Sequence, residues 1–181
     1  FGNGYGPKLI KLKDKQLKRN FKVALSGKNT TNALLFRIAY PEARIVYKNF
    51  LEIENAVLSG EVDAGVLIHE SILNFSDQLC VEREIWDIWS ELNGENLPLP
   101  LGGMALRRSL LMERNLIRVG KEELKAYLNL YANDESISMN ETQLKALNKL
   151  YQIGYDKGFF EKAIDVNDYL IPTEYNEVRF S

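Results

Sequence analysis

A short, continuous apolar segment constrains the fold of this chain more than any other feature. Val66, Leu67 and Ile68 follow Gly65 with no polar residue between them. Such a run is typical of a strand covered on both faces, because a strand with one wet face alternates apolar and polar residues. Strands of this kind belong to parallel or mixed sheets that helices cover on both sides. We therefore expect an α/β protein.

Helical and strand-like segments alternate around this run. Apolar positions at helical spacing predict a helix over about 30–40, which Pro41 ends, and a helix from Phe50 to Val57, which Gly60 closes. A third helix is expected to end near Gly94. The expected strands cover 8–13, 21–25, 44–47, 62–68, 79–81 and 104–107.

The character of the chain changes after residue 110. Two helical stripes of apolar residues follow, and an extended tail is expected from Asp165. The stripes consist of Leu124, Tyr127, Leu128 and Tyr131, and of Leu144, Leu147, Leu150 and Tyr151. Residues 21–105 are therefore predicted as an alternating α/β unit, and 110–158 as mostly helical.

The composition narrows the classes of partner. Of the 181 residues 45% are hydrophobic, which supports a packed core, and the net charge of −2 gives no sign of a nucleic-acid footprint. Lysines alternate with apolar residues from Lys8 to Lys13, which favours an edge strand with one wet face over an anion-binding patch. No segment approaches the roughly 20 apolar residues of a membrane span. The chain starts at Phe1 in a glycine-rich segment, so we expect it to be part of a longer protein.

His69 is the candidate acid–base residue. It is the one histidine of the chain, and it follows the apolar run directly, where α/β sheets bind ligands. Imidazole suits proton transfer near neutral pH. Glu70 either orients the imidazole or lies in solvent, and a hydrogen-bonded structural histidine is the alternative. A metal site is not expected, because Cys80 is distant in sequence and zinc-type spacing is missing. A nucleophilic Cys80–His69 pair is a weaker idea, since Cys80 is expected inside a strand.

Two further segments are candidates for ligand binding. Thr30 and Thr31 lie where a strand turns into a helix after Gly27, and their hydroxyls together with the free helix N–H groups suit a carboxylate or a hydroxyl-rich ligand. The alternative is that Asn29 or Thr30 only caps the helix. The second segment, from Leu97 to Gly103, forms an apolar wall in which two glycines let backbone approach a ligand. Its alternative is an ordinary connection between lobes.

Taken together, these motifs resemble the 1,4-dihydroxy-6-naphthoate synthase family of the futalosine route to menaquinone. The resemblance covers most of 6–108 and, more loosely, the C-terminal helices. Trp86 and Trp89 fall where the family has a tryptophan-rich helix start, although two such residues are more often core. The motifs are Gly27–Thr31, Gly60–Gly65, Ile68–Ser71 and Leu97–Gly102, in order and at the family's spacing.

The resemblance implies a two-lobe, periplasmic-binding-protein-like (type II) α/β architecture, of which this chain holds the first lobe only in part. Residues 1–20 would belong to lobe 1, 21–105 would form lobe 2, and 106–181 would return to lobe 1. The family has further residues before the position of Phe1 and a longer helical stretch between Arg108 and Tyr131.

The resemblance also implies a cytoplasmic lyase that needs no metal or organic cofactor, and the single Cys80 fits a reducing compartment. It would convert cyclic dehypoxanthinylfutalosine to 1,4-dihydroxy-6-naphthoate and release dihydroxyacetone. His69 matches the proposed general base, and the substrate-binding positions are Thr30, Thr31, Leu99, Pro100 and Gly102. The expected partner is a small molecule, with no nucleic acid and no membrane.

Two other functions stay open. A non-catalytic solute-binding protein of the same fold has no need of a proton-transfer residue at a strand end, so His69 argues against it. Chorismate dehydratase shares the fold but lacks the pairing of Ile68-His69-Glu70 with Leu97–Gly102. The sequence leaves the oligomeric state unknown.

Overall fold

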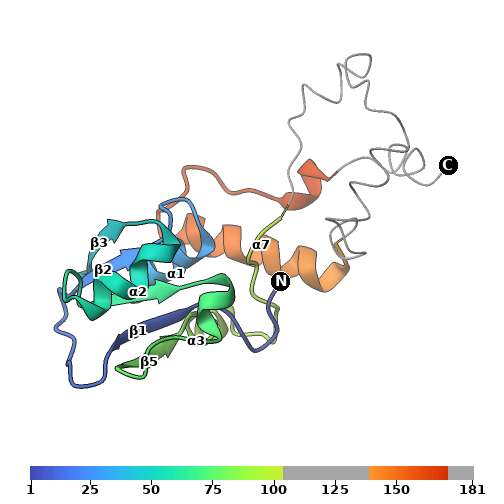
Figure 1. The fold of residues 1–181 in the computed structure, drawn as a ribbon. Helices are drawn as coiled ribbons and strands as arrows, with labels where there is room; N and C mark the ends of the chain where they lie inside the picture. Colours follow the sequence, from blue (N-terminus) through green and yellow to red (C-terminus); the bar gives the residue numbers. More distant parts are fainter. Residues whose placement is uncertain (104–138, 171–181) are drawn as a thin grey trace, which may run out of the picture.

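The computed structural model describes residues 1–103 and 139–170, and its centre is a five-stranded mixed sheet (Figure 1). The strand order is β3-β2-β4-β1-β5. The parallel part consists of β2 (Lys22–Leu25), which pairs with β3 (Arg44–Tyr47) on one side and with β4 (Ala64–Leu67) on the other. All four residues of β4 are buried, which confirms the strand predicted to be covered on both faces.

The antiparallel part of the sheet corrects one expectation. β1 (Lys8–Leu12) lies between β4 and β5 (Leu79–Glu84), so the edge strand predicted from the lysines is wrong. The lysines fit an interior strand because β5 supplies acids beside them: Lys8 pairs with Glu84 at 3.1 Å and Lys11 with Glu82 at 3.3 Å. The sheet thus joins β1 to residues expected in another lobe, while the division of the whole protein into lobes stays a prediction.

Three helices follow the strands as the apolar spacing predicted. They are α1 (Thr31–Ala39), α2 (Phe50–Leu58) and α3 (Ile85–Asn93). Gly94 ends α3 in the left-handed region, with φ 64°, where a side chain would be strained. No described helix has the length and apolar character that crossing a bilayer requires.

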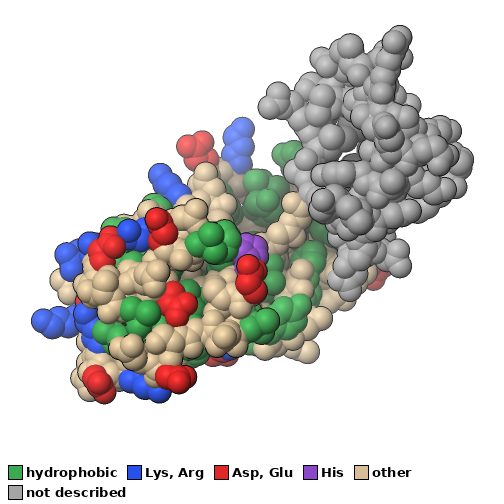
Figure 2. Space-filling model, viewed as in Figure 1, with side chains coloured by type: hydrophobic (Ala, Val, Ile, Leu, Met, Phe, Trp, Pro, Cys, Tyr) green, Lys and Arg blue, Asp and Glu red, His purple; other side chains and the backbone are tan. Residues whose placement is uncertain are grey.

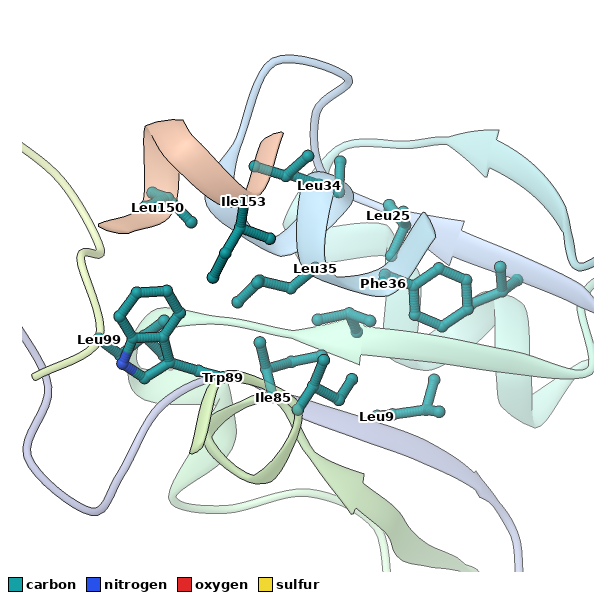
Figure 3. Close-up of a cluster of buried hydrophobic side chains, with 14 of the residues drawn as sticks. Leu9, Leu25, Leu34, Leu35, Phe36, Ile85, Trp89, Leu99, Leu150 and Ile153 are labelled. Carbon is teal, nitrogen blue, oxygen red and sulfur yellow. The ribbon is translucent and has the colours of Figure 1, made fainter. Parts of the chain in front are cut away.

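The two faces of the sheet have separate cores. Side chains alternate along each strand, so Val23 and Leu25 point to one face while Ala24 points to the other. On the first face, α1, α3 and α7 (Glu141–Asp156) pack around Trp89, which has no exposed surface (Figure 3). On the second face, α2 contributes Ile53 and Val57. The helices therefore cover both sides of the sheet.

The C-terminal part of the described chain packs on the first face. α7 begins at Asn140, which forms a capping box with Gln143, and it packs against α3. The tail expected after Asp165 is not fully extended, because the Asp165 carboxylate accepts from the Asn167 N–H and starts the short 3₁₀ helix η2 (Val166–Tyr169). The strand expected at 104–107 and the stripe from Leu124 to Tyr131 lie outside the described residues.

Candidate functional site

The carboxyl ends of β2 and β4 form the edge at which the candidate residues gather. The two strands are adjacent and parallel, so their carboxyl ends lie at the same edge of the sheet. Residues 26–30 connect β2 to α1, and the 3₁₀ helix η1 (His69–Ile72) follows β4 one residue after the strand ends. The topology therefore brings the threonine turn and the histidine to one side of the molecule.

His69 has an unusual backbone conformation. Its φ of 54° lies in the left-handed region, and it is the only described non-glycine residue with a positive φ. Histidine enters this region more readily than β-branched residues do. The Ser71 hydroxyl donates to the Ile68 carbonyl oxygen at 2.5 Å and braces the turn. The strand thus ends abruptly and leaves the histidine, purple in Figure 2, at the surface.

Among the described residues, the His69 imidazole contacts one aromatic ring. The ring of Phe50, at the start of α2, lies edge to face with it, with 5.2 Å between centroids and 69° between planes. Neither imidazole nitrogen has a hydrogen-bond partner within residues 1–103 and 139–170. Glu70 is exposed and makes no bond to the imidazole, so of the two roles considered for it, the solvated one is observed. Both nitrogens are therefore free to meet a ligand.

Thr30 and Thr31 have different roles in the helix start. The Thr30 hydroxyl donates to the Gly27 carbonyl oxygen at 2.9 Å and accepts from the Ala33 N–H at 3.2 Å, which makes it the N-cap of α1. The Thr31 hydroxyl has no hydrogen-bond partner in the described part of the chain, and the residue is half-buried. Thr31 therefore has the free hydroxyl of the pair.

A cavity of about 1040 Å³ adjoins this helix start. Thr30, Thr31, Pro100 and Gly102 line it, so the structure brings together four of the predicted site residues. Leu147 and Tyr151 of α7 add an apolar wall that the sequence did not assign to a site. Lys28 and Arg37 also line the cavity and give it a positive character.

Two predicted site residues lie outside the cavity lining. Leu99 has no exposed surface and packs in the same core cluster as Trp89 (Figure 3). Its backbone exchanges two hydrogen bonds with Gly2, at 2.8 and 2.9 Å. His69 is the other residue, at the neighbouring strand end. Leu99 thus packs in the core behind the cavity wall, and His69 lies outside the cavity, at the carboxyl end of β4.

The other residues considered for a site lie away from His69 or inside the core. The Trp89 Nε1 donates to the Leu97 carbonyl oxygen inside the core. Cys80 lies in β5, which β1 separates from β4, so the structure does not bring it to His69. The residues that the structure describes contain no group of three His, Cys, Asp or Glu side chains arranged to hold a metal ion.

Asp63, at the end of β4 opposite to His69, has a pKa shifted from its usual value. Asp63 lies just before the strand and forms an ion pair with Lys15 at 2.5 Å, while the Lys22 backbone N–H donates to it at 2.7 Å. Both contacts stabilise the ionised carboxylate and hold the pKa of Asp63 below its usual value. Asp63 therefore ties the chain before β2 to the start of β4.

Comparison with known proteins gives one family and several relatives. A family model described as menaquinone biosynthesis matches residues 1–122. The curated 1,4-dihydroxy-6-naphthoate synthase of Streptomyces coelicolor is 34% identical over 116 residues, which cover 60% of this chain and 40% of the relative. That of Thermus thermophilus is 32% identical over 113 residues, with the same coverage. The chain thus spans about 40% of the length of these relatives.

Solved structures agree on the fold. A protein of Archaeoglobus fulgidus is 30% identical, with a TM-score of 0.64 over 88% of this chain and 70% of its own. The ligand-binding component of an ABC-type import system from Staphylococcus aureus reaches a TM-score of 0.58 at 10% identity, covering 98% of this chain and 72% of its own. The periplasmic aliphatic sulphonate binding protein of Escherichia coli reaches a TM-score of 0.52 at 14% identity, covering 91% of this chain and 68% of its own. The predicted periplasmic-binding-protein-like fold is confirmed.

Proposed function

Since the chain belongs to the menaquinone biosynthesis family, we propose that this protein is a 1,4-dihydroxy-6-naphthoate synthase. It would act on cyclic dehypoxanthinylfutalosine, release dihydroxyacetone and leave the bicyclic naphthoate. The two curated relatives carry the name of this enzyme. In this proposal His69 is the general base, and the cavity beside α1 holds part of the substrate.

The geometry of His69 is the observation that carries the proposal. A histidine in the left-handed region at the end of a buried strand presents its ring at the ligand-binding edge of the sheet. Both nitrogens lack a partner among the described residues, so one can accept a proton from a bound molecule. His69 is exposed, so both nitrogens can be reached by a molecule bound at this edge of the sheet.

The lining of the cavity supports the type of substrate. The free Thr31 hydroxyl, the start of α1 and the nearby Lys28 suit a carboxylate and sugar-type hydroxyls. Pro100 and the α7 side chains Leu147 and Tyr151 offer apolar surface for a bicyclic ring. The cavity volume of about 1040 Å³ is at the upper end of the usual range for small-molecule sites.

The proposal includes the expected partners and compartment. The substrate is a small molecule, and no nucleic acid or membrane takes part. The reaction would occur in the cytoplasm, a reducing compartment that agrees with a chain carrying one cysteine.

Turnover by the full-length protein tests the proposal. Incubation with cyclic dehypoxanthinylfutalosine should produce 1,4-dihydroxy-6-naphthoate and dihydroxyacetone in equal amounts, both measured by chromatography with mass detection. Tight binding of the substrate without either product would favour the solute-binding alternative. Dehydration of chorismate in a parallel reaction would favour chorismate dehydratase.

A further inference from the structure

The way in which the His69 imidazole is held differs from the usual arrangement of a general base. Such a histidine commonly donates one N–H to a carboxylate or carbonyl, which fixes its ring. The neighbouring Glu70 does not provide this bond, and no other described group provides it. Within residues 1–103 and 139–170, the imidazole makes one ring contact, edge to face with Phe50.

Phe50 is itself firmly placed. It is the first residue of α2, and the helix start is fixed because the Asn49 side chain accepts from the Leu51 N–H at 3.0 Å. The Phe50 side chain is half-buried and packs against the core cluster that contains Ile53 and Val57. The Phe50 side chain therefore contacts both the core and the histidine.

We propose that Phe50 is the positioning residue for the His69 imidazole, doing through ring contact what a hydrogen-bonded carboxylate does in other sites. The proposal rests on the proposed function, in which His69 is the general base. An aromatic neighbour limits rotation of the imidazole without occupying either nitrogen. Both nitrogens then stay available, one to take the proton and the other to bind substrate or water.

The left-handed backbone of His69 completes this arrangement. Its φ of 54° and the bond from the Ser71 hydroxyl to the Ile68 carbonyl fix the direction in which the side chain leaves the backbone. The backbone conformation fixes the direction of the His69 side chain, and the Phe50 ring limits the rotation of the imidazole. Correct orientation of a reacting group can be worth a large factor in rate, because small misplacements slow the chemical step.

Substitution of Phe50 in the full-length protein tests this role. Phe50→Leu keeps apolar volume against the core but removes the ring, and Phe50→Tyr keeps the ring. We expect Phe50→Leu to lower kcat by about 10-fold, the loss of one aromatic contact, with KM within about twofold of wild type. Phe50→Tyr should retain most of kcat. A merely structural role would lower the melting temperature and leave kcat per folded molecule unchanged.

Phe75→Leu is the matched control. Phe75 is also half-buried against the same core cluster, but its ring makes no ring contact with His69. The Phe75→Leu protein should keep the wild-type kcat and KM. Wild-type kcat in Phe50→Leu, or an equal fall in kcat in Phe75→Leu, would overturn the proposal.

Proton NMR gives a second measurement that does not need turnover. The His69 ring resonance, identified by its loss in His69→Asn, should shift in Phe50→Leu because the ring current of Phe50 is removed. It should stay in place in Phe75→Leu. If the wild-type protein shows no turnover, the proposed function fails, and this resonance decides the positioning claim: an unchanged shift in Phe50→Leu would overturn it.

Discussion

The indole Nε1 of Trp89 donates a hydrogen bond to the backbone carbonyl oxygen of Leu97 at 2.8 Å, from a side chain with no exposed surface. This bond links α3 to the segment that continues into Pro100 and Gly102 at the cavity. The wall of the candidate site is thus fixed from within the core, by a tryptophan that does not touch the cavity.

Replacing Trp89 by phenylalanine should destabilise the fold. The change leaves the Leu97 carbonyl without its buried donor and removes part of a large core side chain, so we expect a loss of about 2–4 kcal/mol in the free energy of unfolding. Urea denaturation measures it. Trp86→Phe is the control, because Trp86 is only half-buried and makes no hydrogen bond with any residue that the structure describes. Equal losses in the two variants would show that the Trp89–Leu97 bond contributes nothing.

Substitutions of the two threonines at the start of α1 should have different effects, one on the free energy of unfolding and the other on substrate affinity. Thr30→Ala removes the N-cap and should cost about 1 kcal/mol of unfolding free energy, while Thr30→Ser should keep most of it. Thr31→Val keeps the side-chain shape and removes the free hydroxyl, so it should weaken substrate affinity by roughly 2- to 10-fold, the value of one hydrogen bond. Its melting temperature should not change. Calorimetry measures the substrate affinity, and thermal melts measure the stability. A Thr31→Val protein with a lower melting temperature and unchanged affinity would contradict the binding role of Thr31.

Gly65 permits the close approach of α2 to β4. A Cβ at this position would lie 2.4 Å from Cγ2 of Ile53 and 3.1 Å from Cγ2 of Val57. Since both neighbours are β-branched and buried, Gly65→Ala should destabilise the fold by about 1–3 kcal/mol. Gly102→Ala is the control for stability, because a Cβ there meets no atom of the described residues within 4 Å. Chemical denaturation of both variants checks the difference, and equal stability would show that the helix can shift at no cost.

The perturbed carboxyl of Asp63 predicts a pH dependence. Ion pairing with Lys15 and the Lys22 N–H lower its pKa in the folded state, so its stabilising contribution is present above its unfolded pKa and is lost as the pH falls through the folded value. Asp63→Asn should therefore be less stable than wild type at pH 7, by up to about 1 kcal/mol for a partly exposed pair. The difference should shrink below about pH 4, the ordinary range of an aspartate. If the difference in unfolding free energy between wild type and Asp63→Asn stays constant from pH 7 to pH 2, the charge of Asp63 does not contribute to stability.

Local patterns predicted most of the elements, because their signals are short-range. The apolar run through Val66 marked β4, and Pro41 and Gly94 marked helix ends that the structure places within a residue or two. The position of β1 could not be predicted in this way. Lysines on alternate residues suit an edge strand, and only the acids of β5, some 70 residues away in sequence, make an interior position favourable.

The candidate site was likewise predictable only in part. The sequence singled out His69 because it follows a buried strand, and Thr31 because it begins a helix. It offered no sign that Phe50 would meet the imidazole, because any apolar residue at that helix position serves the core equally well. The burial of Leu99 could not be predicted for a related reason: a leucine in a proline-rich loop has the same sequence signal whether it faces a cavity or the core.

Turnover of cyclic dehypoxanthinylfutalosine by the full-length His69→Asn protein measures whether His69 is the general base. Asparagine tolerates the left-handed backbone at this position, so the fold and the melting temperature should be kept. We expect kcat to fall by about 10²–10⁴-fold, the usual loss on removing a general base, with substrate binding retained. Turnover close to the wild-type rate in a folded His69→Asn protein would show that His69 is not the general base.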